Sequence, residues 1–166
     1  MKTKRLTRAA LLTAISLALF IVELQIPVPA PIPGIKLGLA NIITVYAVFV
    51  LSPLEAGSIL LARILLGSFF AGQLMSLLYS FVGGLFCFIT MLFIKKIVRM
   101  NQIWACSIIG AMAHNIGQIT VAVIVSQTAA VIWYLPVLLL SGMITGLFTG
   151  ICAQITTERL KRSVRD

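Results

Sequence analysis

Long runs of apolar residues, interrupted at only a few points by proline, glycine or charge, make up most of the 166-residue chain. An apolar stretch of about 20 residues can cross the roughly 30 Å hydrocarbon core of a bilayer as an α-helix. In lipid, helices are the usual form of such stretches because they satisfy their own backbone hydrogen bonds. The pattern predicts an all-α membrane protein with one integral membrane domain over residues 1–166.

Breaks in the apolar runs predict six transmembrane helices. Prolines between residues 27 and 33 end the first run, and Ser52-Pro53 ends the second, because proline cannot continue a helix. One helix from residue 54 to 94 would be roughly 60 Å long, so the chain must fold back, with 71–73 as the best break. The predicted spans are residues 6–26, 37–51, 54–71, 74–94, 103–125 and 130–155.

The positive charges lie at the ends of the predicted spans. Eleven of the 13 basic residues form three clusters, which are Lys2, Lys4, Arg5 and Arg8; Lys95, Lys96 and Arg99; and Arg159, Lys161, Arg162 and Arg165. Loops rich in Lys and Arg stay in the cytoplasm. An even number of spans puts all three clusters on that side, which favours six spans over five and predicts a multi-pass plasma-membrane protein with both termini cytoplasmic. The first apolar run is long for a signal peptide and is expected to be a retained span.

The composition excludes several functional classes. A 60% hydrophobic chain with 10% charged residues is not a soluble domain, where about 25% are charged. The net charge of +9 sits at span ends rather than in a basic stripe with aromatics, so no nucleic-acid binding is predicted. Cys87, Cys106 and Cys152 each lie inside an apolar run and are expected to be small buried hydrophobes.

Acidic residues are too few and too scattered for catalysis. They are Glu23, Glu55, Glu158 and Asp166, and no two are placed to form an acid–base pair. The sequence has no phosphate-binding loop, so ATP hydrolysis would need a partner protein. No catalytic residue, metal site or cofactor is predicted.

Ala10, Ala14 and Ala18 recur every four residues and share one face of the first predicted helix. Small residues at this spacing allow another helix to approach closely. The partner helix can belong to this chain's own bundle or to another protein, and the spacing alone does not decide between them. Gly142, Gly146 and Gly150 have the same spacing and are expected to serve packing within the bundle.

Arg63 lies near the middle of the third predicted span. A charged side chain at this depth costs about 2.5–3.5 kcal/mol, so it normally faces the bundle interior and has a partner. Two interpretations remain open, a structural pair with Glu23 and an anion-binding group for a ligand.

His114, Asn115 and Gln118 form a polar cluster in the fifth predicted span, with His114 and Gln118 on one helix face. Polar groups at this depth need hydrogen-bond partners. The cluster can bond to neighbouring helices, or it can form a pocket wall on which Asn41 and Arg63 converge. Lys36 is expected at the outer mouth of such a pocket, at the end of a proline-rich loop over residues 27–36 that could act as a lid.

Two motifs, GIKLGLAN at residues 34–41 and GAMAHNIGQ at residues 110–118, resemble those of the Gx transporter family, also labelled heptaprenyl diphosphate synthase component I. The resemblance covers roughly residues 6–155. That family is in turn similar to the substrate-binding S components of energy-coupling-factor (ECF) transporters, which have six helices with both termini in the cytoplasm.

The resemblance implies partners and a binding site. In that superfamily an AxxxA motif on the first helix docks onto a transmembrane coupling subunit driven by two ATPase subunits, and Ala10, Ala14 and Ala18 match this motif. The pocket is built largely from helices four to six, which implies substrate-binding roles for His114, Asn115 and Gln118, with Arg63 and Asn41 as further candidates.

Two functions follow. The first is capture of a small, anionic, vitamin-like or precursor-like molecule for an ATP-driven importer, with Arg63 and Lys36 favouring the negative charge. The alternative is a non-catalytic membrane subunit linked to isoprenoid or quinone metabolism or to membrane electron transfer. Prenyl diphosphate synthases hold magnesium and diphosphate with aspartate-rich motifs, and the single aspartate here, Asp166, excludes catalysis of that kind by this chain.

Overall fold

The computed structural model describes residues 2–25, 38–71 and 74–163, and these ranges contain helices and short connections but no β-strand. The α-helices of the described residues are α1 (Lys2–Gln25), α2 (Asn41–Val50), α3 (Pro53–Ala71), α4 (Leu74–Ile94), α5 (Ile103–Ser126) and α6 (Leu135–Ser163). Short 3₁₀ helices precede α5 and α6, and they are η1 (Met100–Gln102) and η2 (Ala129–Tyr134). The all-α fold class predicted from the apolar pattern is confirmed.

Five of the described helices are long and apolar enough to cross a membrane, and α2 is the shorter exception. Its ten residues extend about 15 Å, half of the roughly 30 Å hydrocarbon core. The helix therefore covers only part of the span predicted over residues 37–51. The expected count of six spans is supported by helix length for five of them.

Helix α6 also differs from its predicted span over residues 130–155. The first residues of that span form η2, and α6 continues beyond the span to Ser163. Its 29 residues are about 43 Å long, more than the hydrocarbon core requires. The last turn carries Lys161 and Arg162. The part of α6 beyond the predicted span therefore ends in positively charged residues.

The start of α3 shows how the sequence sets a helix boundary. Ser52 and Glu55 form a reciprocal capping pair, in which the Ser52 Oγ accepts the Glu55 N–H (3.3 Å) and the Glu55 carboxylate accepts the Ser52 N–H (3.2 Å). Pro53 occupies the first helical position, where its missing N–H has no cost. The Glu55 Oε1 also lies 3.8 Å from the Arg5 Nε, and the Glu55 Oε2 lies 3.5 Å from the Arg8 Nη2. These ion pairs join the basic end of α1 to α3.

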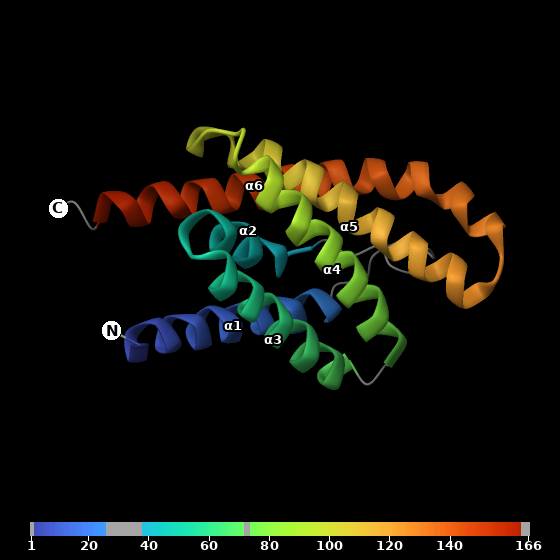
Figure 1. The fold of residues 1–166 in the computed structure, drawn as a ribbon, viewed down its shortest axis with the longest axis horizontal. Helices are drawn as coiled ribbons and strands as arrows, with labels where there is room; N and C mark the ends of the chain where they lie inside the picture. The colour runs from blue at the N-terminus through green and yellow to red at the C-terminus, as the bar shows by residue number, and fades with distance from the viewer. Residues whose placement is uncertain (1, 26–37, 72–73, 164–166) are drawn as a thin grey trace.

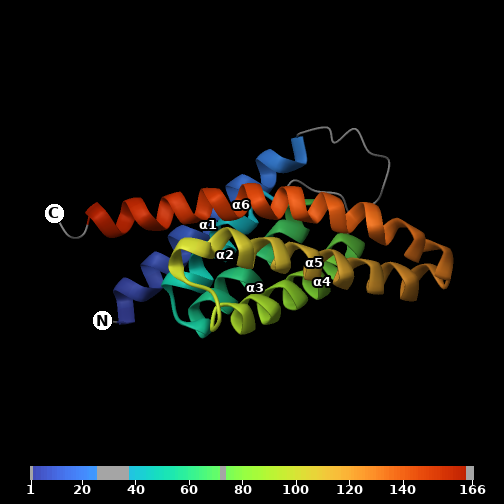
Figure 2. The same cartoon turned by 90° about the horizontal axis from the view of Figure 1, so that it is seen from above.

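The described residues of the three basic clusters lie at one end of the bundle. Figures 1 and 2 both show the start of α1, the connection from α4 to η1, and the end of α6 on the same side of the molecule. The turn from α5 to η2 lies at the opposite end. This arrangement agrees with an even number of spans, which would put all three clusters on the same side of the membrane. That this side is the cytoplasmic one stays a prediction.

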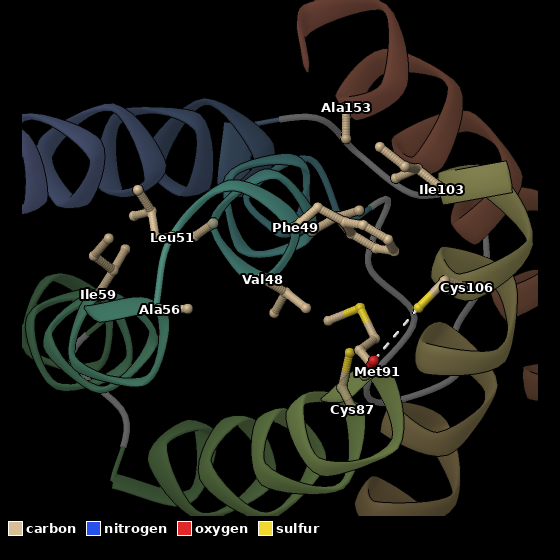
Figure 3. Packing of buried hydrophobic residues seen from close by; sticks show 12 residues of the cluster. Val48, Phe49, Leu51, Ala56, Ile59, Cys87, Met91, Ile103, Cys106 and Ala153 are labelled. Carbon is tan, nitrogen blue, oxygen red and sulfur yellow. Dashed lines mark hydrogen bonds between the residues drawn. The ribbon is translucent and has the colours of Figure 1, made fainter. Parts of the chain in front are cut away.

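Helix α2 packs inside the bundle, where it contacts all five other α-helices. Its residues Val45, Ala47, Val48 and Phe49 are buried and form the centre of the main hydrophobic cluster, together with side chains from α3, α4, α5 and α6. Figure 3 shows this cluster, in which the buried Cys106 thiol donates a 3.7 Å hydrogen bond to the Met91 carbonyl. The core therefore fills the part of the interior nearer the basic end.

Small residues hold α6 directly against α5. Gly142, Gly146 and Gly150 are all buried on α6, and a Cβ added at Gly146 would lie 2.8 Å from the Cα of Ile108. A buried hydrogen bond of 3.1 Å between the Ser107 and Thr149 hydroxyls joins the same two helices. The glycine spacing thus serves packing within the bundle, as the sequence predicted.

Replacing Gly146 with alanine tests this contact. We expect Gly146→Ala to destabilise the protein by about 1–3 kcal/mol, because the backbone of α5 must move to admit the methyl group. The matched control is Gly57→Ala on α3, where the nearest atom, in the Phe88 ring, would lie 3.4 Å away. Thermal unfolding in detergent measures both variants, and equal melting temperatures would contradict the close α5–α6 contact.

Reporter fusions test the orientation. We expect green fluorescent protein fused to either terminus to fluoresce, because both basic ends should remain in the cytoplasm. Alkaline phosphatase fused after Gln127, in the turn between α5 and η2, should be active because that turn lies at the opposite end of the bundle. Active phosphatase at the C-terminus would reverse the assignment.

Candidate functional site

A cavity of about 50 Å³ lies between two groups of helices, near the N-terminal end of α2. The group formed by α1, α3 and the start of α2 contributes Phe20, Glu23, Gly38, Asn41 and Arg63. The group formed by α4, α5 and α6 contributes Ser80, Ala111, His114, Asn115, Gln118 and Thr145. Most of these side chains are polar, which marks the cavity as a different environment from the hydrophobic cluster beside it.

The structure brings together five of the six side chains predicted to bind substrate. Asn41, Arg63, His114, Asn115 and Gln118 all line the cavity. The sixth candidate, Lys36, lies outside the described residues, as does the proline-rich loop over residues 27–36. The convergence of Asn41 and Arg63 on the cluster in α5 agrees with the pocket interpretation, and their role in binding stays a prediction.

The α5 wall follows from helical spacing. His114 and Asn115 follow Ala111 by three and four residues, and Gln118 follows His114 by four, so all four lie on one side of the helix. Glycine on the neighbouring helix lets α4 approach this face, since a Cβ at Gly83 would lie 3.0 Å from both the Gln118 Cγ and the His114 Cε1. This close packing fixes where the two side chains can point.

Arg63 and Gln118, two residues of the cavity lining, each contain a buried polar atom without a described partner. Arg63 is 8% exposed and Gln118 is 5% exposed. Within the described residues, neither the Arg63 Nε nor the Gln118 Oε1 has a hydrogen-bond partner. Leaving a buried polar group unsatisfied costs about 1–3 kcal/mol, and more for a charged one. The two residues therefore have unused hydrogen-bonding capacity beside the cavity.

Glu23 lies on the same wall as Arg63. It is 5% exposed, and its Oε1 accepts a 2.6 Å hydrogen bond from the Gly38 N–H. Among the described residues no ion pair within 4.0 Å joins Glu23 to Arg63, although the two side chains attract each other electrostatically. The structural pair considered from the sequence is thus a longer-range attraction, and the carboxylate is held chiefly by a backbone amide.

Asn115 has a structural role beside its place on the cavity wall. Its side-chain amide donates a hydrogen bond to the carbonyl oxygen of Leu138 on α6. A Cβ added at Gly142 would lie 2.6 Å from the same amide nitrogen. Both interpretations made from the sequence, hydrogen bonding between helices and a pocket wall, therefore apply to this residue.

A second, smaller cavity of about 10 Å³ also borders Phe20 and Arg63, and it has room for about one water molecule. Phe20 was not identified from the sequence, although it lies one helical turn before Glu23. Ser80 and Thr145 were also missed. Single hydroxyl side chains in apolar helices commonly bond to their own backbone, so they carry no signal of a site.

The alanines of α1 face away from the cavity. Ala10, Ala14 and Ala18 are all exposed on the surface of the bundle, and we call this stripe the alanine face. Exposed Leu11 and Ile15 lie beside it. The alternative of packing within this chain's own bundle does not apply to these three side chains in the described structure.

Comparison with curated proteins and with solved structures gives no match. A family model described as heptaprenyl diphosphate synthase component I matches residues 12–156, which include every cavity-lining residue named above. The match covers most of the chain and agrees with the motifs at residues 34–41 and 110–118. The chain therefore belongs to the heptaprenyl diphosphate synthase component I family, the Gx transporter family.

Proposed function

We propose that this chain is the substrate-binding membrane subunit, or S component, of an ECF-type importer that captures a small vitamin-like or precursor-like molecule. The observation that carries the proposal is the polar cavity lined by Asn41, Arg63, His114, Asn115 and Gln118. Within that lining, the buried Arg63 Nε and Gln118 Oε1 lack partners among the described residues. A ligand that hydrogen-bonds to these polar side chains offsets part of the cost of burying them. Membership in the Gx transporter family supports the same proposal.

The alanine face supports an interaction with a coupling subunit. Its three side chains are exposed on one helix, and small residues let a second helix pack closely in lipid. The proposed partners are a transmembrane coupling subunit and two ATPase subunits, since this chain has no nucleotide-binding loop of its own. In this assembly the chain lies in the plasma membrane, with both termini cytoplasmic, and acts as a binding subunit rather than an enzyme.

Arg63 determines how the ligand is oriented in this proposal. Its guanidinium is a permanent donor, so the ligand presents an acceptor group to it, and a carboxylate or phosphate would provide one. His114, Asn115, Gln118 and Asn41 provide further hydrogen bonds from the opposite wall and from the start of α2.

The description of the matched family favours a second candidate function. That description, component I of heptaprenyl diphosphate synthase, suggests a non-catalytic membrane subunit linked to isoprenoid or quinone metabolism. A co-purifying isoprenoid lipid would favour this function, and a co-purifying small polar molecule would favour the first.

Substituting Gln118 tests the cavity as the binding site. Gln118→Met keeps the side-chain length but removes the amide oxygen and nitrogen, and we expect ligand occupancy to fall by about tenfold, the effect of one or two hydrogen bonds. Native mass spectrometry of gently solubilised protein measures the occupancy. The matched control is Gln154→Met, since Gln154 bonds to Glu158 on α6 and does not line the cavity. Equal occupancy in both variants would place the ligand elsewhere.

Enlarging one alanine tests the docking surface. Ala14→Leu should abolish co-purification with the coupling subunit and stop uptake, because the larger side chain keeps the partner helix at a distance. Ala130→Leu, the same change at an exposed position in η2, should leave both unchanged. Normal uptake by Ala14→Leu would show that the alanine face does not mediate coupling.

A further inference from the structure

A groove of about 630 Å³ lies between the start of α3 and the end of α4. It opens on the surface of the bundle, where Ile89 is 44% exposed and Phe93 is 63% exposed. Its volume falls in the range of roughly 300–1,000 Å³ that is typical of ligand pockets. Among the described residues, none lines both this groove and the polar cavity. The groove is lined by four apolar residues and two lysines, which are Pro53, Ile89, Leu92, Phe93, Lys95 and Lys96.

The apolar and charged residues of the groove are separated along α4. Lys95 and Lys96 directly follow Ile94, the last residue of the helix, and they belong to the basic end of the bundle (Figures 1 and 2). Ile89 lies more than one helical turn earlier, about 7 Å along the helix axis. In a bilayer the lysines therefore lie at the level of the headgroups, and the apolar part extends toward the hydrocarbon core.

Lys96 holds its ammonium group beside an apolar side chain of the groove. The Lys96 Nζ lies 5.6 Å from the centroid of the Phe93 ring, and both residues are exposed. A lysine at the end of an apolar helix can lay its stem on apolar surface and keep its charge at the interface. The charge of Lys96 is thus accessible to a molecule that lies in the groove.

Lys95 is held more firmly than Lys96. Its Nζ donates a 2.5 Å hydrogen bond to the carbonyl oxygen of Val48, near the end of α2, and it lies 5.9 Å from the centroid of the Phe49 ring. An ammonium group has three donors, so this bond leaves two for other acceptors. Lys95 therefore joins α2 to α4 and adds a second positive charge at the same end of the groove.

Neither lysine of the groove is neutralised by a carboxylate within 4.0 Å in the described part of the chain. The ion pairs found there connect Glu55, two residues after Pro53, with Arg5 and Arg8. Glu55 also accepts hydrogen bonds from Ser52. The acidic residue nearest to Pro53 in the sequence is thus engaged by other partners, and the lysines remain able to pair with an external anion.

We propose that this groove binds an anionic phospholipid of the bilayer, with the phosphate at Lys96 and Lys95 and an acyl chain against the apolar lining. The charge of the lysines selects the headgroup, since each lysine near an anionic lipid surface favours binding by about fivefold. The apolar lining selects a molecule with a hydrocarbon chain over a free phosphate ion. This site lies outside the polar cavity, so the proposal does not depend on the importer function.

Native mass spectrometry tests the charged end of the groove. The full chain is placed in nanodiscs with equal amounts of phosphatidylglycerol and phosphatidylcholine that have identical acyl chains, and the lipids retained after release are counted. The wild type should retain phosphatidylglycerol preferentially. Lys96→Gln should lower the ratio of the two retained lipids by about fivefold, whereas Lys96→Arg should preserve it. The matched control, Lys161→Gln, removes the same charge from α6 at the basic end and should leave the ratio unchanged.

A bulky substitution tests the apolar part. Ile89→Trp should reduce retained phosphatidylglycerol as strongly as Lys96→Gln does, because the indole ring occupies the place of the acyl chain. Its control is Ile144→Trp, at a 65% exposed position of α6 that does not line the groove. Melting temperatures of all variants verify folding. Should Ile89→Trp fail to fold, the comparison of Lys96→Gln with Lys161→Gln decides the outcome.

Several results would overturn the proposal. Equal losses in Lys96→Gln and Lys161→Gln would show a general attraction of anionic lipid to the basic end, and unchanged retention in both groove variants would show that no lipid binds there. Displacement of phosphatidylglycerol by added inorganic phosphate would make the groove a site for a free anion. Loss of the coupling subunit from Ile89→Trp, with lipid retention unchanged, would assign the groove to a protein helix instead.

Discussion

The short length of α2 determines how the interior of this bundle is divided. A helix of ten residues, buried among the five other α-helices, fills only part of the space between them. Its apolar residues form the hydrophobic cluster nearer the basic end. Beyond its first residue, Asn41, the interior is lined instead by polar side chains from all the surrounding helices. A full-length apolar helix at this place would occupy the cavity, so the cavity exists because α2 begins late.

The charged residues are also divided between the basic end of the bundle and the cavity. The basic clusters at the ends of α1, α4 and α6 lie together at one end of the bundle, where water and anionic headgroups can solvate them. Among the described residues, Arg63 and Glu23 are the charged residues of the cavity wall, and each is buried. In a medium of low dielectric constant such charges persist when they balance each other and accept or donate hydrogen bonds. The Gly38 amide supplies part of this for Glu23, whereas Arg63 retains an atom without a partner among the described residues.

The sequence predicts the all-α class and the polar cluster of α5 because both follow from periodicity. His114 and Gln118 share a face by spacing alone, and Arg63 must face inward because lipid excludes its charge. No periodic pattern marks the start of α2 at Asn41, since most of the residues between 37 and 51 are apolar. The bond between Glu23 and the Gly38 amide depends on a backbone conformation, and the bond from Asn115 to Leu138 depends on how two helices pack. Neither is encoded by residue type at a fixed spacing.

The size of the cavity constrains how it is filled. Pockets for drug-sized ligands are roughly 300–1,000 Å³, whereas this one is about 50 Å³. A larger ligand therefore requires the two groups of helices to separate. The α4–α5–α6 side has little freedom, because Gly83 approaches Gly117 on α5 and Gly146 approaches Ile108, with added Cβ atoms within 3 Å of backbone. Helices α1 and α3 pack against each other, and α1 contacts the group of α4, α5 and α6 less extensively than it contacts α3. Since α3 also packs against α4, widening is easiest at α1, which carries Glu23.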